Sequence, residues 1–211
     1  PQTNWISPMG NRNAAAEFPI VYYIIGQIWK LTGYQLWLTK LFSLGLLMTA
    51  IISLRHFLLW FFESKQKVLV FSGIIFSAPV LIYYADTVLP NIYAFSFLLI
   101  AINACFSYLQ TKSKWSYLAF TIFLSLAILI KVTALIAVLA FLGALFFTVL
   151  LTNTWKSYFS DRRVYWLGLS VLIALLSSFL WYTYAIRYNA AHGSTIFSTT
   201  IRPIWEVSTE E

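Results

Sequence analysis

The sequence predicts an all-α integral membrane protein with about six transmembrane helices and one short helix at the outer membrane boundary. Of its 211 residues, 60% are hydrophobic and only 10% are charged, and the mean hydropathy is +0.77. A soluble domain is nearer 45–50% apolar, with about 25% charged residues. The apolar residues form long runs, and a helix of about 17–25 such residues crosses a hydrocarbon core roughly 30 Å thick. Most charged residues fall between these runs.

Six apolar runs are long enough, or nearly so, to span a membrane as helices. They are Trp37–Leu54, Val68–Tyr84, Asn91–Gln110, Trp115–Ile130, Val132–Leu151 and Val164–Ala185. We therefore expect one membrane domain over residues 1–211. Residues 1–36 form an outer loop with the juxtamembrane helix, 37–185 the six spans, and 186–211 the start of another outer loop. The chain begins at Pro1 without an initiator Met, so we expect it to be part of a longer protein.

A shorter apolar run, Ile20–Leu31, precedes the first span. It is too short to cross the bilayer and suits a helix lying at the interface, where Tyr22, Tyr23 and Trp29 favour the headgroup level. Gly33 is expected to end this helix, because glycine readily adopts the conformation that follows a helix C-terminus.

Basic residues predict the orientation of the chain. Eight of the fourteen lie in alternate connections, as cytoplasmic loops require: Arg55, Lys65, Lys67, Lys112, Lys114, Lys156, Arg162 and Arg163. The net charge of +7 therefore fits topology and anionic lipid rather than nucleic acid. The remaining connections share the outer side, which places Glu17, Asp86, Lys131 and Arg187 near one membrane boundary.

Glu17 lies in Glu17-Phe18-Pro19, directly before the juxtamembrane run. A carboxylate at the edge of an apolar segment is costly, which makes it a functional candidate. Two interpretations stay open. The carboxylate caps the following helix, with Pro19 in its first turn, or it orients a ligand or catalytic group at the membrane surface.

A polar corner is expected between the second and third runs, where Asp86 follows Tyr84 and precedes Asn91. An ordinary turn before a helix that Pro90 starts explains this polarity without function. Alternatively, Asp86, Asn91 and the two tyrosines Tyr83 and Tyr84 form the polar floor of a site.

Lys131 interrupts a long apolar stretch, which predicts a tight break between two spans. Its long side chain can simply extend to the membrane boundary. Alternatively, its ammonium group meets the phosphate of a lipid-linked substrate, with help from Arg187 beside the membrane. Cys105 is the only cysteine, so neither a disulfide framework nor a thiolate metal site is expected, and no glycine-rich phosphate loop is present.

Taken in order, these features resemble the membrane glycosyltransferases of the GT-C fold. The most similar groups are the bacterial relatives of the dolichyl-phosphate-mannose protein mannosyltransferases and the lipid A aminoarabinose transferase. The resemblance rests on an ordered series of short motifs over nearly the whole chain. They are Glu17-Phe18-Pro19 to Thr32-Gly33, Lys40-Leu41, the basic connection Arg55–Lys67, Ser77-Ala78-Pro79, Leu89-Pro90-Asn91 and Lys131-Val132-Thr133.

The resemblance implies inverting transfer of a sugar from a polyprenyl-phosphate donor to a lipid, glycan or protein acceptor, outside a bacterial plasma membrane. Glu17 and Asp86 would be supporting carboxylates, and Lys131 with Arg187 would bind the lipid phosphate. The resemblance places the catalytic base upstream of Pro1, so the base is unassigned. Relatives often carry Asp where this chain has Asn91. No cofactor is therefore assured, and a divalent metal stays open.

A non-catalytic membrane protein, such as a transporter or a lipid-binding subunit, is the alternative. A transporter usually shows inverted repeats and broken helices near the bilayer midplane. This sequence shows one break, and its isolated charges collect at one face, which favours the enzyme.

Overall fold

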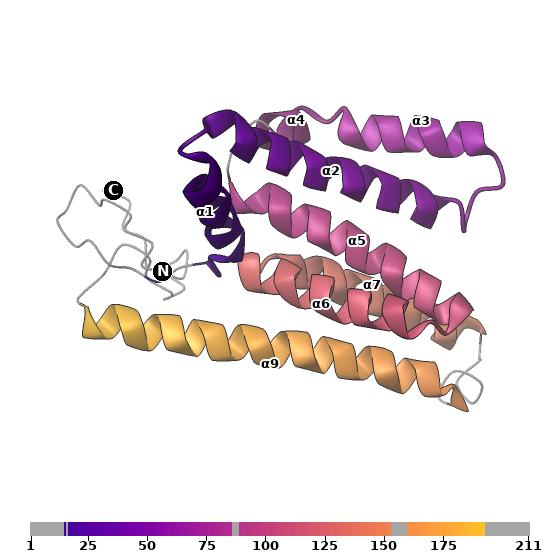
Figure 1. Ribbon diagram of the computed structural model, residues 1–211. Helices are drawn as coiled ribbons and strands as arrows, with labels where there is room; N and C mark the ends of the chain where they lie inside the picture. The colour runs from indigo at the N-terminus through magenta and orange to yellow at the C-terminus, as the bar shows by residue number, and fades with distance from the viewer. Residues whose placement is uncertain (1–14, 16, 86–88, 153–159, 193–211) are drawn as a thin grey trace, which may run out of the picture.

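The computed structural model describes residues 15, 17–85, 89–152 and 160–192, and every element in this part of the chain is an α-helix (Figure 1). The helices are α1 (Ile20–Thr32), α2 (Leu36–Leu58), α3 (Lys65–Phe76), α4 (Pro79–Ala85), α5 (Pro90–Thr111), α6 (Lys114–Ile130), α7 (Ala134–Thr152) and α9 (Arg162–Ala191).

Four of these helices, α2, α5, α7 and α9, are long and apolar enough to cross a membrane. The part of the chain that the structure describes is therefore all-helical, and its four long apolar helices agree with the predicted all-α membrane protein. Helix α6 is also apolar but has 17 residues, which at 1.5 Å per residue gives about 26 Å, slightly less than the hydrocarbon core.

The expectation of one continuous helix over Val68–Tyr84 is wrong. The run divides into α3, of 12 residues, and α4, of 7 residues. The break lies at Ser77-Ala78, directly before Pro79. Proline has no backbone N–H to donate and disfavours helical geometry in the residue before it, so a helix ends here. Neither piece is long enough to span a bilayer alone.

A second correction concerns the predicted outer loop over 186–211. Helix α9 continues to Ala191, so residues 186–191 are helical. Three other expected boundaries are confirmed. Gly33 ends α1 with a φ of 78°, Pro90 is in the first turn of α5, and α6 and α7 are separated at Lys131.

Helix α5 lies at the centre of the bundle and packs against α2 and α6, while α6 packs in turn against α9. Small buried residues let these backbones approach closely, among them Ala101 on α5, Ala127 on α6 and Ala174 on α9. Outward faces carry large apolar side chains instead. Phe179 and Leu180 on α9 are 68% and 66% exposed, as expected for side chains that meet lipid.

The connections between the helices lie at two opposite ends of the bundle (Figure 1). The start of α1, the α6–α7 break and the end of α9 lie together, at what we call the Lys131 end. The α2–α3 and α5–α6 connections and the start of α9 lie at the opposite end, which we call the basic end. By the bounds of these helices, it carries Arg55, Lys65, Lys67, Lys112, Lys114, Arg162 and Arg163.

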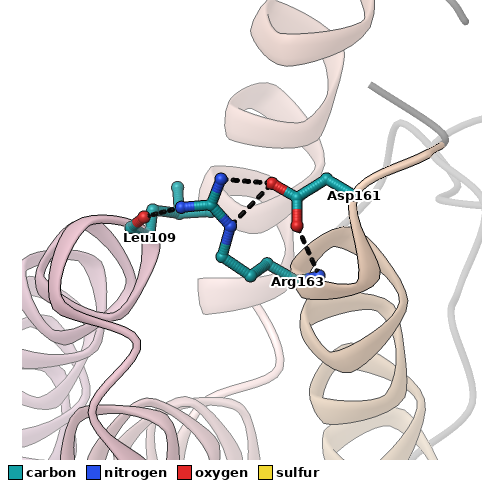
Figure 2. A network of polar contacts seen from close by, with 3 residues as sticks. All are labelled: Leu109, Asp161 and Arg163. Carbon is teal, nitrogen blue, oxygen red and sulfur yellow. Dashed lines mark hydrogen bonds and ion pairs between the residues drawn. The ribbon is translucent and has the colours of Figure 1, made fainter. Parts of the chain in front are cut away.

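At the basic end, an arginine fixes the start of α9 to α5 (Figure 2). Asp161 caps α9, since its Oδ1 accepts a hydrogen bond from the Arg163 backbone N–H at 2.9 Å. Its Oδ2 accepts from Arg163 Nε at 2.6 Å. The same guanidinium donates to the Leu109 carbonyl in the last turn of α5. These hydrogen bonds from Arg163 hold the pKa of the Asp161 carboxyl below its usual value.

Candidate functional site

Lys131 is the residue around which the predicted site residues gather. Its backbone N–H donates to the Ala127 carbonyl at 3.0 Å, and its own carbonyl accepts from the Ala134 N–H at 2.9 Å. Lys131 itself has extended backbone geometry, with φ −147° and ψ 112°. The backbone of Lys131 therefore belongs to the break between α6 and α7. Its side chain takes no part in these backbone hydrogen bonds and can contact other groups.

The Glu17 carboxylate is one such partner, with 3.7 Å between Oε1 and Lys131 Nζ. The two side chains are 37% and 34% exposed, respectively. The helix-capping interpretation of Glu17 is wrong, because Pro19 occupies the N-cap position of α1 and no side chain forms a cap hydrogen bond there. Glu17 instead meets a cation far away in the sequence.

Three contacts hold the segment before α1 in place. We call Ala15 together with Glu17 and Phe18 the strap. The Phe18 backbone N–H donates to the Leu129 carbonyl in the last turn of α6, at 3.3 Å. The Phe18 ring packs edge-on against Trp181 of α9, with 4.9 Å between the ring centroids.

The third contact joins the strap to the end of α9. The Ala15 N–H donates to Asn189 Oδ1 at 2.7 Å, and Asn189 Nδ2 donates to the Ala15 carbonyl at 2.8 Å. Asn189 is buried. The strap therefore lies across the ends of α6 and α9 and fixes the position of Glu17.

Burial dominates the electrostatics of Glu17. Partial removal from water raises the pKa of its carboxyl above 4.5, and the opposing effect of Lys131 is smaller. Tyr22, in the first turn of α1, has a pKa raised to about 12 by burial and by the charge of Glu17. Glu17 thus remains a costly carboxylate even with its cation beside it.

Lys131 also lines a cavity of about 420 Å³ between α4, α5 and α7. Tyr84, Asn91 and Thr133 supply its other polar side chains. The Oδ1 atom of Asn91 is buried without a hydrogen-bond partner in the described part of the chain. An unpaired buried acceptor costs free energy unless a ligand or water satisfies it. The structure therefore brings the predicted residues Lys131, Asn91 and Tyr84 to one cavity.

An apolar cavity of about 240 Å³ adjoins this polar one. It lies between α5, α6, α7 and α9, and Leu98 and Ala137 line both cavities. Its walls include Phe120, Leu124 and Val171. This cavity was not predicted from the sequence, because small and apolar residues within membrane helices carry no distinctive signal.

Two predicted site residues do not join this group. Asp86 lies outside the described residues. Arg187 is exposed on α9 and forms no ion pair with any residue that the structure describes. Asn189, which holds the strap on α9 through two hydrogen bonds, was not predicted, because it lies where an outer loop was expected. Within the described ranges, no group of three or more His, Cys, Asp or Glu residues could hold a metal ion.

Comparisons with known proteins give no assignment: no protein-family model, no curated protein and no solved structure matches this chain.

Proposed function

We propose that this chain is the membrane part of a glycosyltransferase that takes its sugar from a polyprenyl-phosphate donor. One observation supports this most: Lys131 lines a polar cavity that shares Leu98 and Ala137 with an apolar one. A polar cavity with an ammonium group, adjoining an apolar cavity, suits an amphiphile with an anionic headgroup. In this proposal the phosphate meets Lys131, and the first isoprenoid units lie toward Leu98 and Ala137.

The proposed reaction is a single inverting displacement. The acceptor oxygen attacks the anomeric carbon, the bond between that carbon and the phosphate oxygen breaks, and the polyprenyl phosphate leaves with the electron pair. Lys131 stabilises the negative charge that grows on the leaving phosphate. A general base removes the acceptor proton, and we assign no residue of this chain to that role. Glu17 is a supporting carboxylate that forms an ion pair with Lys131.

The orientation belongs to the same proposal. Lys and Arg favour cytoplasmic loops, so the basic end faces the cytoplasm and the Lys131 end faces outward across a bacterial plasma membrane. The predicted topology of six spans makes two demands. Helix α6 must cross the membrane, and α3 and α4 must cross it together as one interrupted segment. Asp86 and Arg187 would then lie on the outer side with Glu17, as a supporting carboxylate and a second phosphate contact.

A lipid-binding protein without catalysis is the second candidate, because the adjoining polar and apolar cavities would also suit stable binding of one amphiphile. The two candidates differ in whether the donor is consumed.

The test is a transfer assay with the full-length protein in liposomes and a panel of polyprenyl-phosphate sugars. We expect release of polyprenyl phosphate from one donor, and Lys131→Gln should raise the KM for that donor about tenfold or more, as loss of a charge-assisted contact predicts. Lys114→Gln at the basic end is the matched control. Binding of donors without turnover would favour the second candidate, and an unchanged donor KM in Lys131→Gln would refute the phosphate role.

A further inference from the structure

Lys131 pairs with one carboxylate and also lines a cavity. Its ammonium group faces the Glu17 carboxylate of the strap at 3.7 Å, and Lys131 is one of the residues that line the 420 Å³ cavity. A strong hydrogen bond between an ammonium and a carboxylate has a length of about 2.7–2.9 Å. The Glu17–Lys131 pair is therefore loose, and a cation on a long flexible stem can exchange partners at little cost.

We infer that Glu17 is an internal competitor of the anionic headgroup: it pairs with Lys131 while the cavity is empty and gives way when a phosphate enters. This inference rests on the proposed role of Lys131 and adds a regulatory role for the strap. Each binding event must break the Glu17–Lys131 pair, so the apparent affinity for the phosphate is reduced by the strength of that pair.

The contacts of the strap allow this exchange without movement of the backbone. The three contacts that hold the strap use the backbone and ring of Phe18 and the backbone of Ala15. None of them uses the Glu17 side chain. Glu17 can therefore turn away from Lys131 by side-chain rotation while the strap stays on α6 and α9.

The environment of Glu17 makes its release feasible. Its carboxyl is partly buried, and burial already raises its pKa. Once a phosphate takes Lys131, the carboxylate loses the partner that favours its charged form. It then takes up a proton from water more readily or rotates into water, and its exposed fraction of 37% leaves a path for rotation.

A positioning role for Glu17 gives the opposite expectation. If the carboxylate served to aim Lys131 at the ligand, removal of its charge would misplace the ammonium and weaken phosphate binding. If it competes, removal of its charge frees Lys131 and tightens binding. The neutral isostere Glu17→Gln separates the two, because it keeps the size of the side chain and removes the charge.

The experiment measures equilibrium binding of dodecyl phosphate to the full-length protein in dodecyl maltoside, with inorganic phosphate as a second ligand without a tail. Glu17→Gln should bind dodecyl phosphate roughly two- to five-fold more tightly, as expected for loss of a half-exposed ion pair. Glu63→Gln, an exposed carboxylate change at the basic end, should bind as the unmodified protein does. Lys131→Gln should bind more weakly.

Inorganic phosphate distinguishes the two sources of the headgroup chemistry. If it displaces dodecyl phosphate and shows the same ratio between Glu17→Gln and the unmodified protein, the competition concerns the phosphate alone. Unchanged or weaker binding of dodecyl phosphate to Glu17→Gln would overturn the inference. Tighter binding without any sugar transfer would leave the inference standing and remove the proposed activity. Unchanged binding to Lys131→Gln would remove the phosphate role, and the inference with it.

Discussion

The side-chain amide of Asn189 forms two hydrogen bonds with the backbone of Ala15, one in each direction, at 2.7 and 2.8 Å. Asn189 belongs to the last turns of α9, and Ala15 precedes α1. This pair therefore joins opposite ends of the described chain and holds the strap that carries Glu17. Because the amide is buried, its donor and acceptor have few alternatives once the strap leaves.

Asn189→Ala should release the strap from α9. The change removes both hydrogen bonds to Ala15 and should cost about 0.5–1.5 kcal/mol for each of them. We expect a lower Tm in detergent and faster proteolysis before α1. Gln66→Ala, an exposed amide change on α3, is the control. Proteolysis at the unmodified rate would show that the Phe18 contacts alone fix the strap.

The raised pKa of Glu17 predicts a specific pH dependence of stability. The folded protein keeps the Glu17 proton in a pH range above 4.5 where the unfolded chain has lost it. The stability that this group contributes is therefore full below pH 4.5 and falls as pH rises through the folded-state pKa. Among the residues that the structure describes, Lys131, Tyr22 and Tyr182 interact electrostatically with Glu17.

The measurement compares Tm for the unmodified protein and Glu17→Gln between pH 4 and pH 8. Relative to Glu17→Gln, the unmodified protein should lose stability as pH rises through this window. Glu63→Gln serves as the control at the basic end. A difference that grows in favour of the unmodified protein at high pH would mean that the ion pair with Lys131 outweighs burial.

Local backbone chemistry explains why several helix ends could be predicted from the sequence. Gly33, Pro90 and Lys131 each act on their own turn, since a glycine, a proline or an isolated charge limits a membrane helix without help from distant residues. The break before Pro79 was missed because the apolar length of Val68–Tyr84 was given more weight than one proline inside it. The end of α9 was missed because polar residues such as Asn189 suggested a loop.

Individual residues of the candidate site could be predicted from the sequence, but the contact between Glu17 and Lys131 could not. Glu17 and Lys131 each stand out because a charge beside an apolar run is costly. The distance of 3.7 Å between them depends on how the strap packs against α6 and α9. The periodicity of the sequence does not predict this packing. The apolar cavity that adjoins the polar one depends on how α7 packs against α5 and α6, which residue types alone do not reveal.

The Arg163 contacts predict that the start of α9 is sensitive to a conservative change (Figure 2). Arg163→Lys keeps the charge but lacks the forked guanidinium that reaches both Asp161 and the Leu109 carbonyl. We expect a lower Tm than for Arg162→Lys, which changes the exposed neighbouring residue. Equal Tm values for the two variants would show that Asp161 capping alone holds this end of α9.

A buried hydrogen bond joins α2 to α5, with 2.7 Å between Ser43 Oγ and the Tyr93 hydroxyl. Ser43 also donates to the Thr39 carbonyl at 3.0 Å, so Tyr93 is the donor to Ser43. Tyr93→Phe removes that donor and should cost about 0.6 kcal/mol, the average for such bonds in membrane helices.

A double-mutant cycle with Ser43→Ala tests this value through the free energy of unfolding in mixed micelles. Tyr83→Phe, which removes an exposed hydroxyl on α4, is the control and should have little effect. A coupling free energy near zero between Ser43 and Tyr93 would show that shape, rather than this hydrogen bond, aligns α2 with α5.

The orientation can be tested with single cysteines, because Cys105 is buried and can be replaced by alanine to give a silent background. We expect Arg187→Cys at the Lys131 end to react with an impermeant maleimide added outside intact cells. Lys112→Cys at the basic end should react only after the membrane is permeabilised. The reason is the charge asymmetry: seven described Lys and Arg residues lie at the basic end, and such residues are retained in the cytoplasm. The reverse labelling pattern would place Glu17 and Lys131 in the cytoplasm and would exclude sugar transfer at the outer face.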